Sequence, residues 1–261
     1  MSEFEYLNNI INQYTPRHSI LHNFSIPAQL KSLLIPWAKP YDISLVSTGS
    51  TAKKTAISLS SDLDYFLELP NRCNVALKDI YNGLYEELSY AYNDTRKQNV
   101  SIGIKINDLK IDITPGIKQS KNTNYYSIYK SKSDSWTQTN IALHNQQISE
   151  SGRTSEIKLL KIWRELHNLE FPSIYLEYLL KNEVLLNKVK SNNNPRYLRE
   201  NFFYSLTELA KDRGNPLYAR VIDPSNSNNI FSELINSQAK QKIIQQAKNS
   251  IKASDWKDIV Y

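Results

Sequence analysis

The segment from Leu63 to Leu69 places acidic side chains within an apolar run. It reads Leu-Asp-Tyr-Phe-Leu-Glu-Leu, follows Asp62 and is closed by Pro70, which is typical of a β-strand. Side chains at positions i and i+2 of a strand point to the same face, so Asp62 and Asp64 present two carboxylates side by side. Like charges repel, and burying them without compensation is costly. The chain is therefore expected to fold into a sheet with paired carboxylates on one face.

The first half of the chain mixes strand and helix patterns. Alternation of apolar and polar residues predicts strands, and apolar residues three to four positions apart predict helices. We expect helices over residues 26–38 and 74–92, and strands over residues 43–46, 63–69, 100–106 and 109–113. Asn107 and Asp108 form the predicted hairpin turn between the last two strands. This half is therefore expected to be a mixed sheet with helices.

The second half has a different character, because its periodicity is helical. Helices are expected over residues 154–167, 172–180, 197–211 and 232–251, and Pro172 suits the first turn of the second helix. A turn-rich loop from Asp223 to Asn229 precedes the last helix. The pattern predicts an α+β chain with a mixed core over residues 1–150 and a helical domain over residues 151–261.

The composition favours an anionic partner and argues against a zinc site. The 261 residues are 40% apolar and carry a net charge of +6, with a pI near 9.1, which suits triphosphates, RNA or DNA. The lysines are spread along the chain, so the charge also fits an ordinary solvated surface. Cys73 is the only cysteine, and no further ligand accompanies His18 and His22, so neither a disulfide nor a zinc site is expected.

The sequence also contains no membrane or secretion signal. No apolar stretch approaches the length that spans a bilayer. The N-terminus reads Met-Ser-Glu-Phe-Glu-Tyr, which lacks the basic and apolar regions of a signal peptide. We therefore expect a cytoplasmic protein that does not bind a membrane.

A third carboxylate completes a candidate two-metal site. Asp112 lies in the strand-like run Leu-Lys-Ile-Asp-Ile, so it faces away from its two isoleucine neighbours. Mg²⁺ prefers oxygen ligands and is commonly held by a few carboxylates together with substrate phosphates. Two such ions, Mg²⁺ or Mn²⁺, can activate an attacking hydroxyl and hold the leaving group. Asp62, Asp64 and Asp112 are therefore the predicted metal ligands, with Asp112 placed to take the hydroxyl proton.

Gly49 and Ser50 form a candidate phosphate-binding turn. A glycine lets the backbone approach a phosphate closely, and the neighbouring N–H and hydroxyl can donate to it. Each signal alone has a commoner explanation, because an Asp-x-Asp pair is usually a solvated turn and Gly-Ser is usually a loop. The Gly-Ser pair, the Asp-x-Asp pair and Asp112 occur in this order and have strand-like flanking residues, which favours the catalytic interpretation.

This order of motifs resembles the DNA polymerase β-like nucleotidyltransferase superfamily. The family pattern is Gly-Ser, a spacer of about a dozen residues, Asp-x-Asp and a later Asp on another strand. Here it reads Gly49-Ser50, eleven residues, Asp62-Leu63-Asp64 and then Asp112. The residue before Gly49 is Thr, a mild departure from the apolar residue of the family.

The helical half resembles the oligoadenylate synthases and the bacterial cGAS/DncV-like nucleotidyltransferases (CD-NTases). Residues 156–163 resemble their Lys-x-Trp helix, and residues 172–177 resemble their Ser-Phe-x-Leu-Glu helix start. Asp223-Pro224 followed by Asn228-Asn229 resembles their Asp-Pro…Asn loop. The resemblance spans about residues 43 to 256, which is most of the chain.

The resemblance implies roles for further residues. The Gly-Ser pair would hold the triphosphate, and Lys161 and Ser173 match positions that contact donor phosphates. A surface lysine and a plain helix cap are the alternatives for these two. Some family members stack a nucleobase on a Tyr directly after that Ser, whereas Ile174 follows here and Tyr175 comes one residue later. Tyr125, Tyr126, Tyr129 and Trp136 either stack bases or anchor an irregular segment onto the core.

The resemblance implies a template-independent enzyme that joins NTPs with release of pyrophosphate. The CD-NTases do this to make cyclic or linear oligonucleotide second messengers in antiphage signalling. An RNA-directed enzyme of the CCA-adding or tailing type is the alternative, because it shares the three carboxylates and differs in its acceptor. A transferase acting on a small molecule or protein is disfavoured by the helical motifs, and a non-enzymatic binding module by the intact carboxylates.

Overall fold

In a computed structural model of the protein, residues 3–16, 25–60, 62–191 and 196–261 are described, so His18 and His22 lie outside the described residues. Contacts divide the chain into two units. The helical unit comprises residues 1–15, 54–60 and 146–261, and the sheet unit comprises residues 16–53 and 61–145. Among the described helices, none is both long and apolar enough to cross a membrane.

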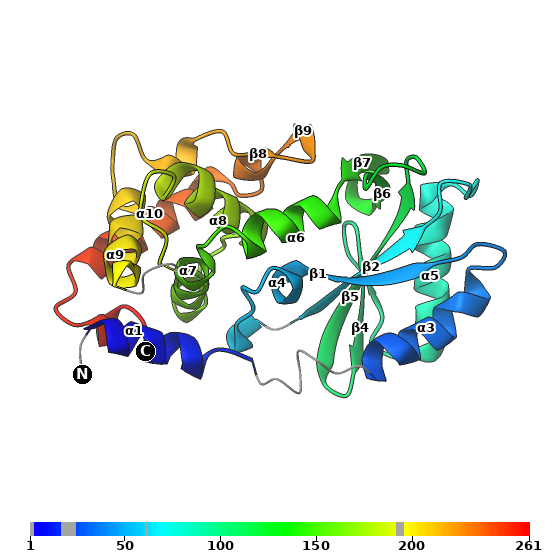
Figure 1. Ribbon diagram of the computed structural model, residues 1–261, viewed down its shortest axis with the longest axis horizontal. Coiled ribbons are helices and arrows are strands. Elements are labelled where there is room, and N and C mark those ends of the chain that lie inside the picture. The colour runs from blue at the N-terminus through cyan, green and yellow to red at the C-terminus, as the bar shows by residue number, and fades with distance from the viewer. Residues whose placement is uncertain (1–2, 17–24, 61, 192–195) are drawn as a thin grey trace. The chain divides into compact units, whose positions relative to one another are not determined.

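A seven-stranded mixed sheet forms the centre of the sheet unit (Figure 1). Its order is β1-β2-β5-β4-β3, with β6 paired to β5 and β7 paired to β6. Strands β2 and β5 run parallel, and the other pairings of this sheet are antiparallel. The strands are β1 (Ser44–Thr48), β2 (Leu63–Leu69), β3 (Arg96–Lys97), β4 (Ile102–Ile106), β5 (Leu109–Lys118), β6 (Tyr126–Lys130) and β7 (Ser135–Thr139).

The two faces of β2 have different surroundings, because side chains alternate along a strand. One face joins the main core of the sheet unit, to which β2 contributes Leu63, Tyr65, Leu67 and Leu69. The other face carries Asp64 and Glu68, and Phe66 between them is buried in a smaller cluster. The bounds of this strand are those predicted, with Asp62 directly before it. Asp64 therefore lies on the face of β2 that points away from the main core of the sheet unit.

Helices α3 (Ser25–Trp37) and α5 (Leu77–Ala91) pack against the same core. Strands β4 and β5 are joined by the predicted hairpin turn, since Ile106 pairs with Leu109 across it. Asn107 and Asp108 have φ angles of 49° and 65°, the left-handed values that a two-residue hairpin turn requires. The α+β class predicted for the chain is confirmed by this mixed sheet and the helices that follow it.

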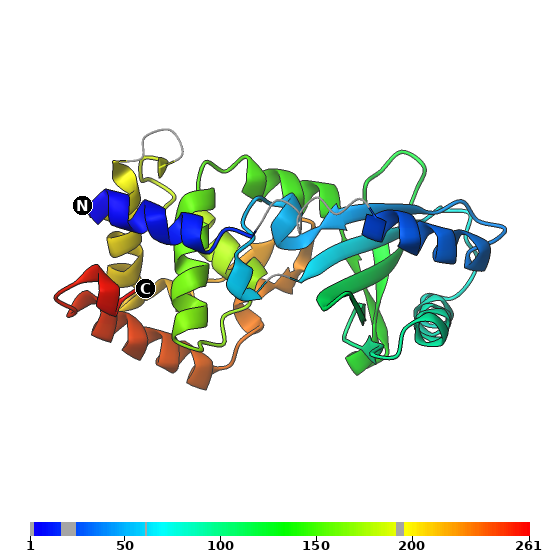
Figure 2. The same ribbon diagram turned by 90° about the horizontal axis from the view of Figure 1, so that it is seen from below.

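The helical unit buries one hydrophobic core. Its helices are α1 (Glu3–Gln13), α7 (Thr154–Leu166), α8 (Ser173–Leu179), α9 (Tyr197–Leu209) and α10 (Ser237–Ile251), and a π-helical turn over Leu180–Val184 follows α8. Helix α1 contacts α7 and α9 (Figure 1; Figure 2). The sequence places α1 with the core over residues 1–150, whereas its contacts place it with the C-terminal helices. Helix α6 (Ile141–Ser149) has residues in both units.

The turn-rich loop predicted from Asp223 to Asn229 is wrong as stated, because most of it is a β-hairpin. Strands β8 (Ile222–Asp223) and β9 (Asn226–Ile230) form a two-stranded sheet. The Asp223 carboxylate stabilises the turn by accepting hydrogen bonds from the N–H and hydroxyl of Ser225, at 2.8 and 2.7 Å. The amide of Asn229 donates to the other oxygen of Asp223 at 2.9 Å.

The last helix also begins later than the predicted residue 232. Residues Phe231–Glu233 form a separate 3₁₀ turn, and α10 starts at Ser237. Asn236 caps it, because its side-chain oxygen accepts the N–H of Ala239 at 2.8 Å. The spacing of apolar residues in the sequence stays helical on both sides of Asn236. Periodicity alone therefore predicts a helix that begins at residue 232, before the cap.

The aromatic segment after β5 is a regular hairpin, β6–β7, and not an irregular segment. Tyr126 and Tyr129 are buried, and the Tyr126 hydroxyl donates to Glu68 at 2.7 Å. Trp136 on β7 is 62% exposed. The two tyrosines therefore anchor the hairpin to the sheet, while Trp136 stays accessible.

Candidate active site

The candidate site is built on a row of residues that crosses five strands of the sheet unit. Thr48 of β1 pairs with Asp64 of β2, and Asp64 pairs with Asp112 of the parallel strand β5. Asp112 pairs in turn with Gly103 of β4, and Gly103 pairs with Arg96 of β3. Two of the three predicted carboxylates are therefore next to each other on adjacent strands.

Gly49 brings its backbone against the first of these carboxylates. It begins the short helical turn α4 (Gly49–Ala52) directly after β1, with a φ of 64° that favours glycine. A Cβ atom at this position would lie 1.8 Å from Oδ2 of Asp64, which is a severe clash. Only glycine fits here, and Ser50 follows it in the same turn. The predicted Gly-Ser turn and Asp64 therefore meet in the structure.

Asp112 is held by two side chains of the same unit. Its side chain is 17% exposed, and its Oδ1 accepts a hydrogen bond from Nε2 of Gln98 at 2.7 Å. A terminal nitrogen of Arg96 lies 3.4 Å from the same oxygen. Burial raises the pKa of Asp112 and the charge of Asp62 adds to the rise, while Gln98 and Arg96 act in the opposite direction.

The side chains of the candidate site offer the ligands that a divalent cation requires. Asp62, Asp64 and Asp112 offer carboxylate oxygens alone, and the backbone of Gly49 lies against Asp64, which suits a hard cation shared with a phosphate. In the described part of the chain, no group of three or more His, Cys, Asp or Glu side chains is already gathered as a metal-ligand set. The residue types and their strands therefore fit Mg²⁺.

Lys161, predicted to contact donor phosphates, is buried in the helical unit. Its Nζ lies 2.6 Å from Oε1 of Glu177 and donates to the Thr55 hydroxyl at 2.9 Å. The Lys161 and Glu177 side chains are 2% and 1% exposed. A contact between Lys161 and a phosphate would compete with this ion pair. The predicted role of Lys161 in binding donor phosphates therefore stays a prediction.

Ser173 is the first residue of α8, as the predicted helix-start hydroxyl requires. Its Oγ accepts a hydrogen bond from Arg164 at 2.9 Å, and Arg164 is one turn after Lys161 on α7. Tyr175 is fully buried and its hydroxyl donates to the carbonyl of Leu217 at 2.9 Å, so this ring packs in the core and does not present a face to a base. The structure thus brings Lys161 and Ser173 onto neighbouring helices of one unit, and the three aspartates belong to the other.

The sequence interpretation missed Arg96, Gln98 and Gly103. Gly103 interrupts the alternating segment 100–106, and a glycine inside a strand often marks a close approach by another group. A Cβ atom at Gly103 would lie 2.7 Å from the guanidinium carbon of Arg96, so the glycine leaves room for that side chain. Gly103 was the one sequence signal that could have indicated this cluster, because no sequence pattern predicts the contact between Gln98 and Asp112.

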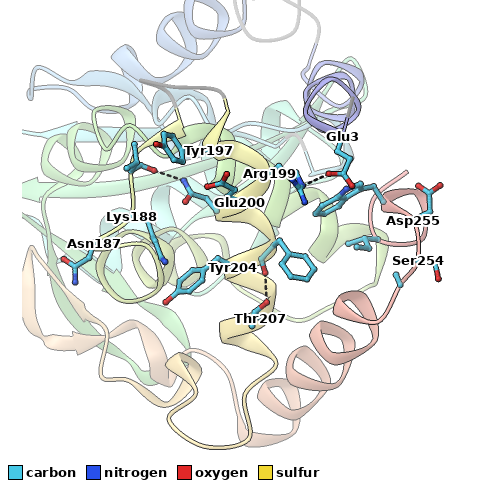
Figure 3. Close-up of a pocket in the computed structure, with 16 residues that line it drawn as sticks. Glu3, Asn187, Lys188, Tyr197, Arg199, Glu200, Tyr204, Thr207, Ser254 and Asp255 are labelled. Atoms are coloured by element: carbon cyan, nitrogen blue, oxygen red, sulfur yellow. Dashed lines mark hydrogen bonds and ion pairs between the residues drawn. The ribbon is translucent and has the colours of Figure 1, made fainter. Parts of the chain in front are cut away.

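A cavity of about 620 Å³ in the helical unit contains none of the predicted site residues (Figure 3). Its lining includes an ion pair between Glu3 and Arg199 at 2.5 Å, and Lys188 lies 3.7 Å from the centre of the Tyr204 ring. The charged side chains that line it are Glu3, Glu200, Asp255, Lys188 and Arg199. Three acidic and two basic groups do not form a site for a polyanion such as a triphosphate.

Comparison with known proteins gives one family match, which covers part of the sheet unit and part of the helical unit. Residues 39–151 match the family model described as the Second Messenger Oligonucleotide or Dinucleotide Synthetase domain. That stretch contains Gly49, Ser50 and all three aspartates, whereas Lys161 and Ser173 lie beyond it. No curated protein matches the chain.

Solved structures match the fold over nearly the whole chain. CdnC of E. coli MS115-1 with ATP has a TM-score of 0.72 and 20% identity, covering 96% of this chain and 91% of its own. The CdnE cyclic dinucleotide synthase of Elizabethkingia meningoseptica has a TM-score of 0.67 and 13% identity over 100% of both chains. The Cid1 poly(U) polymerase has a TM-score of 0.66 and 13% identity, covering 95% of this chain and 93% of its own.

These identities establish a shared fold. The chain therefore has the fold of the CD-NTases, and its residues 39–151 match the second-messenger oligonucleotide or dinucleotide synthetase model.

Proposed function

We propose that the protein is a template-independent nucleotidyltransferase that joins NTPs into a cyclic or linear oligonucleotide second messenger, as the CD-NTases of antiphage signalling do. The observation that carries this proposal is the contact of the Gly49 turn with Asp64, in register with Asp112, inside the segment that matches the synthetase model. The ATP and GTP bound to related CD-NTases support NTPs as the substrates.

The proposed reaction is attack by a sugar hydroxyl of one NTP on the α-phosphorus of another. A new phosphodiester P–O bond forms, the bond between the α-phosphorus and its bridging oxygen breaks, and pyrophosphate leaves. Asp112 takes the hydroxyl proton. The backbone of Gly49 and the hydroxyl of Ser50 bind the triphosphate.

Asp62, Asp64 and Asp112 would hold two Mg²⁺ or Mn²⁺ ions. Bound there, the ions supply charge stabilisation at the phosphate and acidify the attacking hydroxyl. Lys161 and Ser173 are proposed as donor-phosphate contacts. The hydroxyl of Ser173 suits this role because it lies at a helix start, where anions are favoured.

An RNA-directed transferase is the second candidate, and one observation supports it. The fold also matches Cid1, a poly(U) polymerase, nearly as well as it matches CdnE. The net charge of +6 is compatible with an RNA acceptor. The fold is therefore compatible with either an NTP or an RNA as the acceptor.

One assay separates the two candidates. The protein is incubated with all four labelled NTPs and Mg²⁺ or Mn²⁺, with and without RNA, and the products are resolved. A phosphatase-resistant small product formed without RNA supports the second-messenger synthase. Label transferred only to RNA supports the alternative, and no pyrophosphate release under any condition contradicts both.

Asp64→Ala tests the site itself. We expect kcat to fall about a thousandfold or more, because bound metals contribute several kcal/mol and about 1.4 kcal/mol corresponds to tenfold. The fold should persist, because the change also relieves a charge repulsion. Asp108→Asn is the matched control, since Asp108 is an exposed carboxylate at the hairpin tip between β4 and β5. Equal rates for the two variants would rule out this site.

A further inference from the structure

Gln98 makes the shorter of the two described hydrogen bonds to the Asp112 carboxylate. Its Nε2 donates to Oδ1 of Asp112 at 2.7 Å, a short bond to a carboxylate that is mostly buried. Arg96 approaches the same oxygen at 3.4 Å from a side chain that is 44% exposed. Within the described part of the chain, no hydrogen-bond donor contacts Oδ2 of Asp112. Both donors therefore turn one oxygen of Asp112 inward and leave the other for reaction chemistry.

Gln98 is itself held by its backbone. Its N–H donates to the carbonyl of Ser101 at 2.9 Å, which closes a tight turn after β3. Its carbonyl accepts hydrogen bonds from the hydroxyl of Tyr81 on α5 and from the hydroxyl of Ser131 at 2.7 Å. Tyr81 is 1% exposed, so this support belongs to the core. The amide of Gln98 is consequently presented from a rigid position.

The side-chain oxygen of Gln98 is oriented as well. The hydroxyl of Ser101 lies 3.3 Å from Oε1 of Gln98 and donates to it, which directs Nε2 toward Asp112. A neutral donor orients a carboxylate without neutralising its charge. A cation in the same place would compete with a metal for the carboxylate, and Arg96 is more distant and more solvated. The position suits a group that orients Asp112 and leaves its charge available.

We propose that Gln98 is a positioning residue for the nucleotidyl transfer, acting through Asp112 and not on the substrate. This inference rests on the proposed function, because it assigns Asp112 to the reacting centre. Residues that orient metal ligands typically contribute about 10–100-fold to metal affinity or activity. Gln98 is expected to have an effect of that size.

The test uses Gln98→Met, which keeps the length of the side chain and removes the donor. We expect the dissociation constant for Mn²⁺, measured by calorimetry without NTP, to rise about 10–100-fold. The kcat of NTP joining should fall by a similar factor with KM unchanged, because the substrate is not touched. Gln119→Met is the matched control, since Gln119 is an exposed glutamine of the same unit whose side chain, among the described residues, donates to the Ser127 hydroxyl and to no carboxylate.

A double-mutant cycle separates positioning from damage to the fold. In an Asp112→Asn background, Gln98→Met should have no further effect on Mn²⁺ affinity, because its partner carboxylate is already gone. Additive effects, or wild-type Mn²⁺ affinity in Gln98→Met, would overturn the proposal. Wild-type protein that joins no NTPs contradicts the proposed function, and the Mn²⁺ cycle still decides the role of Gln98.

Discussion

Lys161 shows how one residue can satisfy a sequence motif and still have a different partner in the structure. The motif assigns its ammonium group to a donor phosphate, whereas in the structure it pairs with Glu177 and Thr55 inside the helical unit. Burying two charges costs several kcal/mol for each ion, and their attraction and hydrogen bonds offset that cost only while both are present. The pair is therefore sensitive to the loss of either member.

Lys161→Met is expected to lower the free energy of unfolding by about 3–5 kcal/mol, because it leaves the Glu177 carboxylate buried without its cation. Urea denaturation measures this. Lys242→Met is the control, since Lys242 is an exposed residue of α10. An unfolding free energy equal to that of the control, together with weaker ATP binding, would show that Lys161 serves the phosphate and not the fold.

At the scale of elements, the sheet brings the site together by aligning single positions of five strands. Arg96, Gly103 and Asp112 are consecutive members of the row, so the guanidinium must pass over Gly103 to approach Asp112. The hypothetical Cβ at Gly103 lies 2.7 to 2.9 Å from three atoms of the Arg96 guanidinium group. Because Gly103 of β4 has no side chain, Arg96 of β3 can approach Asp112 of β5.

Gly103→Ala should displace Arg96 and leave the strand intact, because the flexible end of the arginine side chain yields more easily than the backbone. We expect the same small loss of kcat in Gly103→Ala and in Arg96→Ala, and no further loss in the double variant, since both remove one contact. Steady-state pyrophosphate release from the three variants measures this. Losses that add up would mean that Gly103 serves the packing of the sheet itself.

At the scale of the whole molecule, a helix at the N-terminal end of the sequence belongs to the same unit as the C-terminal helices. Helix α1 belongs by contacts to the unit formed by the C-terminal helices. The hydroxyl of Tyr6 donates to the carbonyl of Val260 at 2.8 Å, and that of Tyr14 donates to the carbonyl of Tyr261 at 2.6 Å. Leu7 is fully buried in the core of the helical unit.

Leu7→Ala is expected to destabilise the helical unit by about 2–5 kcal/mol, because it removes buried methyl groups and leaves a cavity. Chemical denaturation gives the free energy, and hydrogen exchange should quicken in α7 and α9, which α1 contacts. Asn8→Ala, at an exposed position of the same helix, is the control. Unchanged exchange in α7 and α9 would contradict the assignment of α1 to this unit.

Local patterns predicted the elements whose residues alternate or repeat clearly. The bounds of β2 and the Asn107-Asp108 turn were predictable because side-chain period and turn chemistry are local properties. The β8–β9 hairpin was missed because its run of Ser and Asn residues also reads as a turn. Burial of Lys161 was missed because it depends on Glu177 and Thr55, which are distant in the sequence.

The sequence by itself determined that Asp62 and Asp64 flank a strand residue, that Asp112 faces away from its apolar neighbours and that a Gly-Ser turn precedes them. Only the tertiary structure decided that β2 and β5 pair in parallel and in register, which sets Asp64 beside Asp112. It also decided that Gln98 donates to Asp112. The physical reason is that strand register and loop placement follow from burial of the whole core, and a shift of one residue would turn each carboxylate to the other face.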